Sequence, residues 1–378
     1  MDSTETLKAK NTNSMGTWNP TETKPSHSIE LRIIAGILVV ALLLSIVGNG
    51  LIAIRIRSGS RTEAAATNYL VDNTDYVQQG RLERVQSKVQ TMGVPETLED
   101  FYRLAGTQIA EEKYPEALHS VGICLMLCSE DNHDLYVDLL MKKGCLLVLV
   151  NQFSEALTVL DQVITRQPDL ADAYLVKAQV YAAWQKNDAL AAALISYLDL
   201  VPEDSEIRLV LGQTQYLLGN FEAAATEYAY ILEKAAPDQD VSQAAYLCGL
   251  TNLQLERYDQ AVPALIKARS QDPKLEAIDY YIGVCQMSLE QYAEAAENLT
   301  KSVDQNVMVQ LSRYSRGICR LMLDESQYQG ALEDLQFAAD YQGSDADQTV
   351  SGQAANLITE LKNAETLTDD NSEGSLQE

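Results

Sequence analysis

Four side chains that lie close together in the sequence have the types that can bind a metal ion: His119, Cys124, Cys128 and His133. Cysteine thiolates and histidine imidazoles are common zinc ligands, and two cysteines four residues apart share one face of a helix. His119, however, lies five positions before Cys124 and points to another face, and His133 lies in an acidic stretch. We therefore expect the cysteines to pack as small hydrophobic residues, and we predict no metal site and no cofactor.

The residue inventory offers little support for other catalytic chemistry. The chain has three histidines, none in a recognisable triad, and no glycine-rich loop that would hold a phosphate group. Carboxylate pairs such as Glu111 and Glu112 are numerous because the chain is acidic, so a solvated helix face is the simpler interpretation. We predict that the protein is not an enzyme and has no catalytic residue.

The strongest pattern in the chain is a repeat with a period of about 34 residues, which runs from about Leu98 to Tyr341. A small residue returns at one phase of each unit, and an aromatic residue followed three positions later by alanine returns at a second phase. The small residues are Ala105, Gly144, Ala178, Gly212, Gly249, Gly283 and Gly317. The pairs are Tyr114 with Ala117, Phe153 with Ala156, Phe221 with Ala224, Tyr258 with Ala261, Tyr292 with Ala295, and Tyr328 with Ala331. Prolines at 168, 202, 237 and 273 close successive units.

This pattern has a physical explanation in the packing of helix pairs. Two antiparallel helices approach closely only where one side lacks bulk, so we expect each phased glycine to meet the alanine of the second helix. Glycine within a helix costs about 1 kcal/mol relative to alanine, so its recurrence at one phase indicates that close packing offsets this loss. The aromatic residue is expected to fill the space beside the small pair.

The phased residues resemble the tetratricopeptide repeat family, whose unit is a helix-turn-helix of about 34 residues. The resemblance implies an all-α solenoid of about seven repeats, stacked in a right-handed superhelix with one continuous core, and a role in binding. The third unit departs from the pattern because Asn187 replaces the aromatic residue. We expect its second helix to be rotated or to begin one residue late.

The resemblance also implies where a partner binds. In this family the first helices line the concave surface, and their second, fifth, ninth and twelfth positions tend to face a bound peptide. Here the second position is acidic in the first four units, and tyrosine returns at the fifth position. The predicted groove residues are Glu99, Tyr102, Asp138, Asp172, Glu206, Tyr246, Tyr280, Tyr281, Val284, Tyr314 and Ile318. The alternative is that these rings pack between adjacent helices.

An uncharged apolar run of 22 residues occupies positions 33–54. As a helix it would be long enough to cross a bilayer. Arg55 and Arg57 follow it directly, where a cleaved signal peptide would have small residues, so we predict a single transmembrane helix. The flank after the run is more basic than the flank before it, which favours a cytoplasmic repeat domain, with the opposite orientation as the alternative.

The chain carries a net charge of −26, and this charge limits the partners that it can attract. Positions 1–62 hold seven basic and four acidic side chains, so the remainder of the chain carries −29. Such a surface repels nucleic acid and anionic lipid head groups, and it favours a neutral-to-basic protein or peptide with apolar anchors.

We therefore predict a membrane-anchored scaffold that binds a partner in an acidic, tyrosine-lined concave groove. Two alternatives are an extracytoplasmic assembly or chaperone factor that engages unfolded or translocating chains, and a homo-oligomeric structural assembly. The predicted layout is a disordered leader (1–32), the transmembrane helix (33–54), a linker in which a degenerate capping repeat is one interpretation (55–97), the repeat array (98–343), and a capping helix with an acidic disordered tail (344–378).

Overall fold

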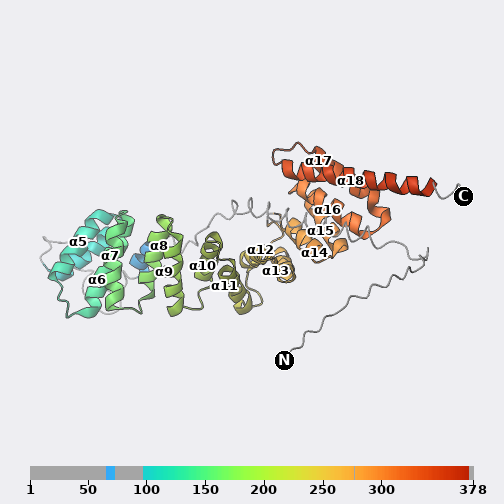
Figure 1. Cartoon of the computed structure of the whole chain (residues 1–378). Helices are drawn as coiled ribbons and strands as arrows, with labels where there is room; N and C mark the ends of the chain where they lie inside the picture. The colour runs from blue at the N-terminus through green and yellow to red at the C-terminus, as the bar shows by residue number, and fades with distance from the viewer. Residues whose placement is uncertain (1–64, 73–96, 276, 374–378) are drawn as a thin grey trace, which may run out of the picture.

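The structure is a computed structural model that describes residues 65–72, 97–275 and 277–373, and every regular element in these ranges is a helix. Seven antiparallel helix pairs follow one another along the chain (Figure 1), which confirms the expected all-α solenoid. The pairs are α4 (Leu98–Ala110) with α5 (Tyr114–Leu127), α6 (His133–Leu149) with α7 (Phe153–Arg166), α8 (Ala171–Ala183) with α9 (Asn187–Leu200), α10 (Ser205–Leu217) with α11 (Phe221–Lys234), α12 (Ser242–Gln254) with α13 (Tyr258–Gln271), α14 (Ile278–Ser288) with α15 (Tyr292–Asp304), and α16 (Val309–Leu323) with α17 (Tyr328–Asp340).

Two further helices lie outside these pairs. α3 (Ala65–Asp72) precedes the repeats, and α18 (Gln348–Glu373) follows them and packs against α17. The sequence predicts a capping helix followed by a disordered tail in positions 344–378. The helix α18 is found in this range, and it extends to Glu373, into the predicted tail. Among the helices that the structure describes, none combines the length and the apolar character needed to cross a bilayer. The leader and the predicted span, residues 1–32 and 33–54, lie outside the described residues.

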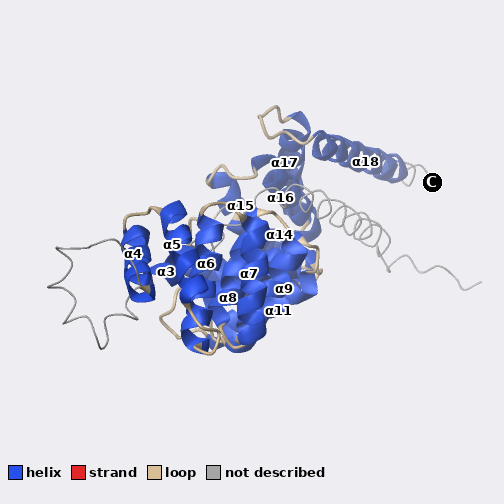
Figure 2. Ribbon diagram, turned by 90° about the vertical axis from the view of Figure 1, so that its left-hand side faces the viewer, coloured by secondary structure: helices blue, strands red, loops and turns tan. Residues whose placement is uncertain are grey.

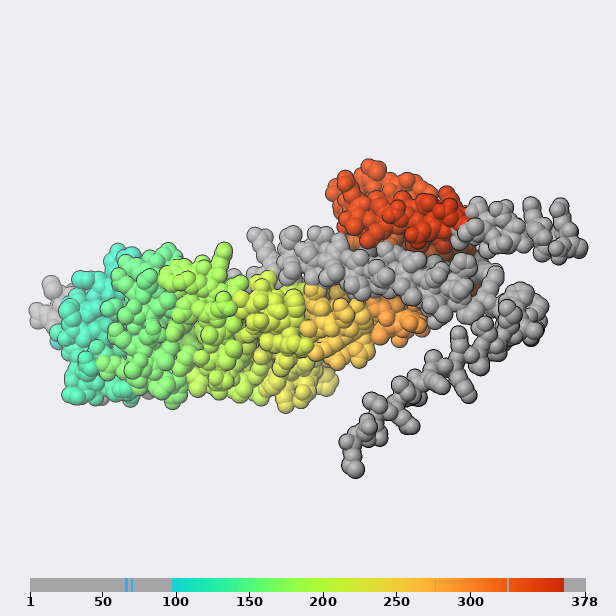
Figure 3. All heavy atoms as spheres, in the orientation of Figure 1, coloured from blue at the N-terminus to red at the C-terminus, as the bar shows by residue number. Residues whose placement is uncertain are grey.

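The first helices of the repeats form the inner row of the solenoid. From α4 onward every helix packs against the next one along the chain. First helices also contact first helices of the following repeat, in the pairs α6–α8, α10–α12, α12–α14 and α14–α16. In a curved stack, the helices that contact their counterparts in the adjacent repeats lie on the inner side, where the spacing is closer. Figure 2 shows the stack from its end, and in Figure 3 the repeats coloured from cyan to orange follow one another without a break.

The phased glycines lie where the two helices of a repeat approach most closely. A Cβ atom on Gly212 would lie 2.5 Å from Cε1 of Tyr228, and one on Gly249 would lie 2.5 Å from Cγ of Leu265. The side chain four residues after the phased alanine therefore fills the space beside each of these glycines.

In the last three repeats the phased glycine also meets the phased alanine, as expected, through the backbone carbonyl group of the alanine. A Cβ atom on the glycine of the fifth repeat would lie 3.4 Å from the carbonyl oxygen of Ala261, and the corresponding distances to Ala295 and Ala331 are both 3.2 Å. Their small size allows the backbone of the second helix to approach the first. All six alanines at this phase are 0% exposed: Ala117, Ala156, Ala224, Ala261, Ala295 and Ala331. Ala105 and Ala178, which replace the glycine in the first and third repeats, are also buried.

The turn inside a repeat has one recurring backbone conformation. In the first six repeats, the residue after the first helix and its cap has a left-handed φ of 56° to 77°: Glu112, Asn151, Gln185, Gly219, Glu256 and Glu290. The next residue donates its N–H to a carbonyl five positions earlier, as Gln152 does to Leu147 at 2.8 Å. This arrangement satisfies carbonyl groups at the helix end, and in these six turns Gly219 alone adopts it without a Cβ penalty. The seventh turn contains a short 3-10 helix, η4 (Glu325–Gln327).

The third repeat keeps the register of the others. Its second helix begins at Asn187, one full repeat period after Phe153 begins the second helix of the previous repeat. The expectation of a rotated or delayed helix is therefore wrong. Leu190 takes the position of the alanine and Leu194 the position of Leu160, and both leucines are buried. The apolar spacing along the helix, rather than the aromatic residue, sets this register.

Candidate binding surface

A short helix from outside the repeats lies on the inner row of first helices. α3, drawn in blue in Figure 1, packs against α6 and α8, the first helices of the second and third repeats. Its residues Ala65, Ala66, Tyr69 and Leu70 are all buried. Residues with this spacing share one face of a helix, so α3 presents a single apolar face to the repeats.

A hydrogen bond fixes the N-terminal end of α3 on the third repeat. The backbone N–H of Ala66 donates to the side-chain Oε1 of Gln179 at 2.9 Å. The first N–H groups of a helix have no partner within the helix itself, so a side-chain acceptor on α8 satisfies one that would otherwise be buried and unpaired.

The ring of Tyr69 lies over a cluster of polar side chains from the first two repeats. Asp138 accepts hydrogen bonds from the hydroxyl of Tyr102 at 2.8 Å and from Nζ of Lys142 at 2.6 Å. Lys142 Nζ lies 5.9 Å from the centre of the Tyr69 ring and 5.5 Å from that of Tyr102, within the range of a cation–π contact. Lys142 is only 5% exposed, so the cluster lies away from solvent.

The charge around Tyr69 keeps its phenol protonated. Burial raises the pKa of Tyr69 well above its usual value, and the negative charges of Asp138 and Asp172 raise it further. A neutral phenol in this position is a hydrogen-bond donor facing carboxylates. The acidic second positions of the second and third repeats therefore face the aromatic residue of the bound helix.

The structure brings together three of the predicted groove residues, Tyr102, Asp138 and Asp172, around α3. Glu99 and Glu206 are exposed, and Glu99 lies 3.6 Å from Arg103 of its own helix. Lys142 and Gln179 also line this site, and neither is among the predicted groove residues. Gln179 stands at the ninth position of its first helix, one of the positions that face a peptide in the family, and this phase could have identified it.

Five other groove predictions are wrong. Tyr280 and Tyr314 are 0% exposed, and Tyr281, Val284 and Ile318 are also buried. These side chains belong to the core because α14 contacts both α12 and α16, so the closely spaced first helices cover them. Tyr246 is half-buried, with its ring centre 6.3 Å from that of Tyr281.

The two cysteines among the four candidate metal ligands, Cys124 and Cys128, pack in the interior or at its edge. Cys124 is fully buried, which raises the pKa of its thiol to about 11, and Cys128 is half-buried. Among the residues that the structure describes, no three metal-ligating side chains are arranged to hold an ion.

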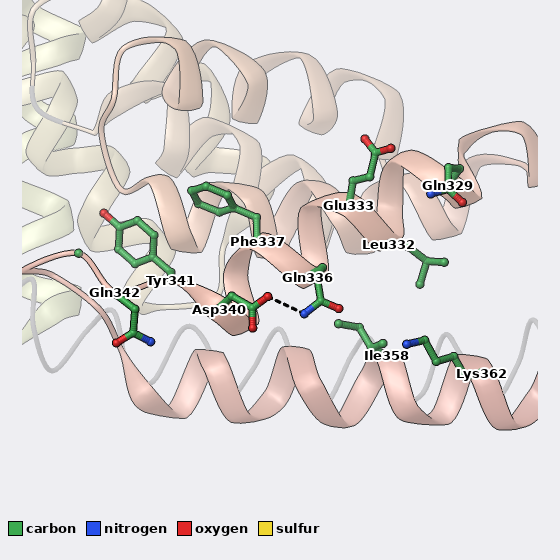
Figure 4. A pocket seen from close by; sticks show the side chains of 11 residues that line it. Gln329, Leu332, Glu333, Gln336, Phe337, Asp340, Tyr341, Gln342, Ile358 and Lys362 are labelled. Carbon is green, nitrogen blue, oxygen red and sulfur yellow. Dashed lines mark hydrogen bonds between the residues drawn. The ribbon is translucent and has the colours of Figure 1, made fainter.

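An open groove of about 790 Å³ lies between α17 and α18 (Figure 4). Leu332 and Phe337 of α17 and Ile358 of α18 line it, and Nε2 of Gln336 donates to Asp340 at 2.7 Å. Arg313 packs over the Phe337 ring at 4.2 Å. The hydroxyl of Tyr341, which also lines the groove, donates to Asp345 at 2.9 Å.

Comparison with known proteins identifies the repeats. The sequence model of the tetratricopeptide repeat family matches residues 185–240 and 247–306. No curated protein sequence matches the chain.

Several solved structures are similar to it. A tetratricopeptide repeat protein from Parabacteroides merdae has a TM-score of 0.40 and 15% identity, covering 68% of this chain and 98% of that one. YrrB, described as having an unusual peptide-binding site, has a TM-score of 0.40 and 21% identity, covering 46% and 88%. MamA AMB-1 has a TM-score of 0.39 and 20% identity, covering 47% and 93%. The match to the family model supports the assignment of tetratricopeptide repeats to residues 185–240 and 247–306.

Proposed function

We propose that the protein is a non-enzymatic scaffold that holds a protein or peptide partner on the concave surface of its repeats. The observation that supports this function is the position of α3, a helical segment from outside the repeats that is bound across α6 and α8. A surface that buries one helix through an apolar face, a polar anchor and a ring contact has the features of a helix-binding groove.

The charge of the surface supports a neutral-to-basic partner rather than nucleic acid. Residues 63–378 carry a net charge of −29. Glu99 and Glu206 are exposed, and they lie on first helices at either side of the α3 site. These carboxylates would steer a basic partner toward the inner row and orient it there.

The proposal includes attachment to a membrane through residues 33–54, with the repeats on the cytoplasmic side. The length and lack of charge of this run support the anchor. α3 begins at Ala65, eleven residues after the run. Even a fully extended connection of this length spans only about 40 Å, so bound α3 would keep the first repeats close to the bilayer.

A photo-crosslinking experiment in cells tests the scaffold function. A photoreactive residue at Glu206 should form adducts with a partner, whereas one at Met126, which is 77% exposed on the second helix α5, should not. Charge reversal at Glu99→Lys should reduce the adducts at Glu206, because the partner is attracted by this row. Equal adduct formation at both positions would contradict a concave binding site.

Thiol labelling tests the orientation. In a Cys128→Ser background the five remaining cysteines are buried, so a Met126→Cys variant carries one exposed thiol. Labelling by an impermeant reagent only after permeabilisation supports the cytoplasmic side. Labelling in intact cells would favour the extracytoplasmic assembly or chaperone factor, and a size that depends on concentration would favour the homo-oligomeric assembly.

A further inference from the structure

We propose that α3 is an intramolecular ligand of the surface formed by α4, α6 and α8, and that the external partner bound there is a short helix with the same side-chain pattern. The pattern is two small residues followed by tyrosine and an aliphatic residue, as in Ala65, Ala66, Tyr69 and Leu70. This inference rests on the proposed scaffold function and specifies the partner and its regulation: α3 and the partner compete for one site.

The two small residues allow the helix to approach the repeats closely. Ala66 is fully buried, and its backbone N–H lies 2.9 Å from Oε1 of Gln179. A larger side chain at this position would need space that the first helices occupy, and it would lift the backbone from its hydrogen-bond acceptor. The site therefore selects alanine, serine or glycine here.

The tyrosine fits a site with two kinds of contact. Its ring lies over Lys142, whose ammonium group is held by Asp138 at 2.6 Å. Its hydroxyl lies in the negative field of Asp138 and Asp172. Phenylalanine would keep the ring contact but would lack the hydroxyl donor that faces the carboxylates. The loss of this donor would cost binding free energy, so the site prefers tyrosine to phenylalanine.

The aliphatic residue completes the apolar face. Leu70 is buried, and Ala65, Ala66, Tyr69 and Leu70 belong to the same hydrophobic cluster as the first three repeats and α10. Since the four residues occupy one face, an external helix needs only this face to replace α3, whatever its other residues are.

Displacement is feasible because α3 is short and tethered. A helix of eight residues is marginal in isolation, so part of its contact energy is spent on ordering it. Twenty-five residues separate Asp72 from Leu98, enough for α3 to leave without moving the repeats. A tethered ligand has an effective concentration on the order of millimolar, so bound α3 weakens the binding of an external helix to the same site. Release of α3 removes this competition, and the external helix then binds more tightly.

A binding assay on the full chain, kept in detergent, tests the competition. The probe is a fluorescent synthetic peptide of residues 61–76, and its anisotropy is measured with wild type and with a release variant, Tyr69→Ala/Leu70→Ala. Both changes lie in α3, so the repeats keep their sequence. We expect the release variant to bind the peptide about tenfold more tightly or better, and a peptide with the same two alanines should not bind.

A second measurement follows α3 itself. The amides of residues 66–72 should be protected from hydrogen exchange in wild type, and excess peptide should remove this protection. A variant with Gln179→Ala in the release background should bind the peptide several-fold more weakly. Circular dichroism and melting must show that all variants keep the helical array.

Three outcomes would overturn the inference. The release variant could bind the peptide no more tightly than wild type does, or the amides of residues 66–72 could exchange freely in wild type. Wild type could also form a dimer that the release variant does not form, which would place α3 in a neighbouring copy. If adducts at Glu206 persist in any of these cases, the scaffold function stands and only the intramolecular ligand is rejected.

Discussion

Ala66 and Gln179, which lie 113 residues apart in the chain, are joined by a hydrogen bond of 2.9 Å between the backbone N–H of the first and the side-chain Oε1 of the second. This contact links a helix outside the repeats to the first helix of the third repeat. It shows how the inner surface recognises a helix: through a polar side chain that caps the helix N-terminus, next to a face that buries its apolar residues.

Replacement of Gln179 by alanine should loosen α3 without unfolding the repeats. A hydrogen bond to a backbone amide contributes about 1 kcal/mol, so the exchange protection of residues 66–72 should fall by about fivefold. The measurement is native-state hydrogen exchange. Gln342→Ala, at an exposed position beyond α17, is the control and should leave the protection unchanged. Equal protection in both variants would show that the hydrogen bond does not stabilise α3.

The Gly212→Ala variant should be less stable than wild type. The new Cβ would lie 2.5 Å from Cε1 and 2.9 Å from Cζ of Tyr228, whose ring is fully buried. Overpacking of this kind costs about 1–3 kcal/mol, which exceeds the gain of about 1 kcal/mol from higher helix propensity. Thermal melting measures the effect.

The matched control is Gly122→Ala in α5, where no atom lies within 4 Å of the added Cβ. Only the propensity gain applies there, so this variant should melt at the same or a slightly higher temperature. If both variants melt alike, the close approach of the helices does not explain the phased glycines.

Asp334 should be essential for the seventh repeat. Its carboxylate is 1% exposed and accepts hydrogen bonds from Arg316 and Arg320, each at 2.7 Å. Asp334→Asn would leave the buried guanidinium group of Arg316 and the half-buried one of Arg320 without a counter-charge. Loss of one partner of a buried ion pair costs about 3–5 kcal/mol. Hydrogen exchange in α16 and α17, followed in urea, should show this loss locally.

Asp161→Asn is the control for this experiment. Asp161 also forms an ion pair, with Nζ of Lys177 at 2.6 Å, but the Asp161 side chain is 62% exposed. A solvated pair contributes about 0–1 kcal/mol, so this variant should be close to wild type. If the two variants lose similar amounts of local stability, burial does not explain the contribution of the Asp334 ion pairs.

Alkaline pH should destabilise the repeats through buried thiols and a phenol. Burial raises the pKa of the Cys285 and Cys319 thiols to about 12, and it also raises the pKa of Tyr216 to about 12. Unfolded thiols titrate near pH 8.5 and phenols near pH 10. Because the folded pKa is the higher one, the stabilisation is complete below the unfolded pKa and is lost as the pH rises toward 12.

The free energy of unfolding should therefore fall from about pH 9 upward, by as much as about 1.4 kcal/mol per pH unit for each titrating group. Urea unfolding at pH 8, 9, 10 and 11 measures it. Cys319→Ala should reduce the slope between pH 9 and 10. A free energy of unfolding that stays constant up to pH 11 would contradict burial of these groups.

The contacts inside one repeat are local, and for this reason the sequence predicts them well. The small residue of the first helix and the alanine of the second belong to consecutive helices, as Gly212 and Ala224 do, so a regular spacing alone predicts the helix pairs and their number. The same argument explains why Asn187 still begins α9: the buried leucines that follow it repeat at helical spacing whatever residue stands at the start.

Two features depended on the tertiary structure. Tyr280 and Tyr314 have the phase of groove residues, but the spacing between first helices of neighbouring repeats decides whether a ring at this phase reaches solvent, and here the contacts of α14 with α12 and α16 bury them. The position of α3 is the second feature. The sequence analysis did not predict this helix, because its apolar face packs on a surface assembled from separate repeats, and only the folded chain brings Tyr69 to Lys142 and Ala66 to Gln179.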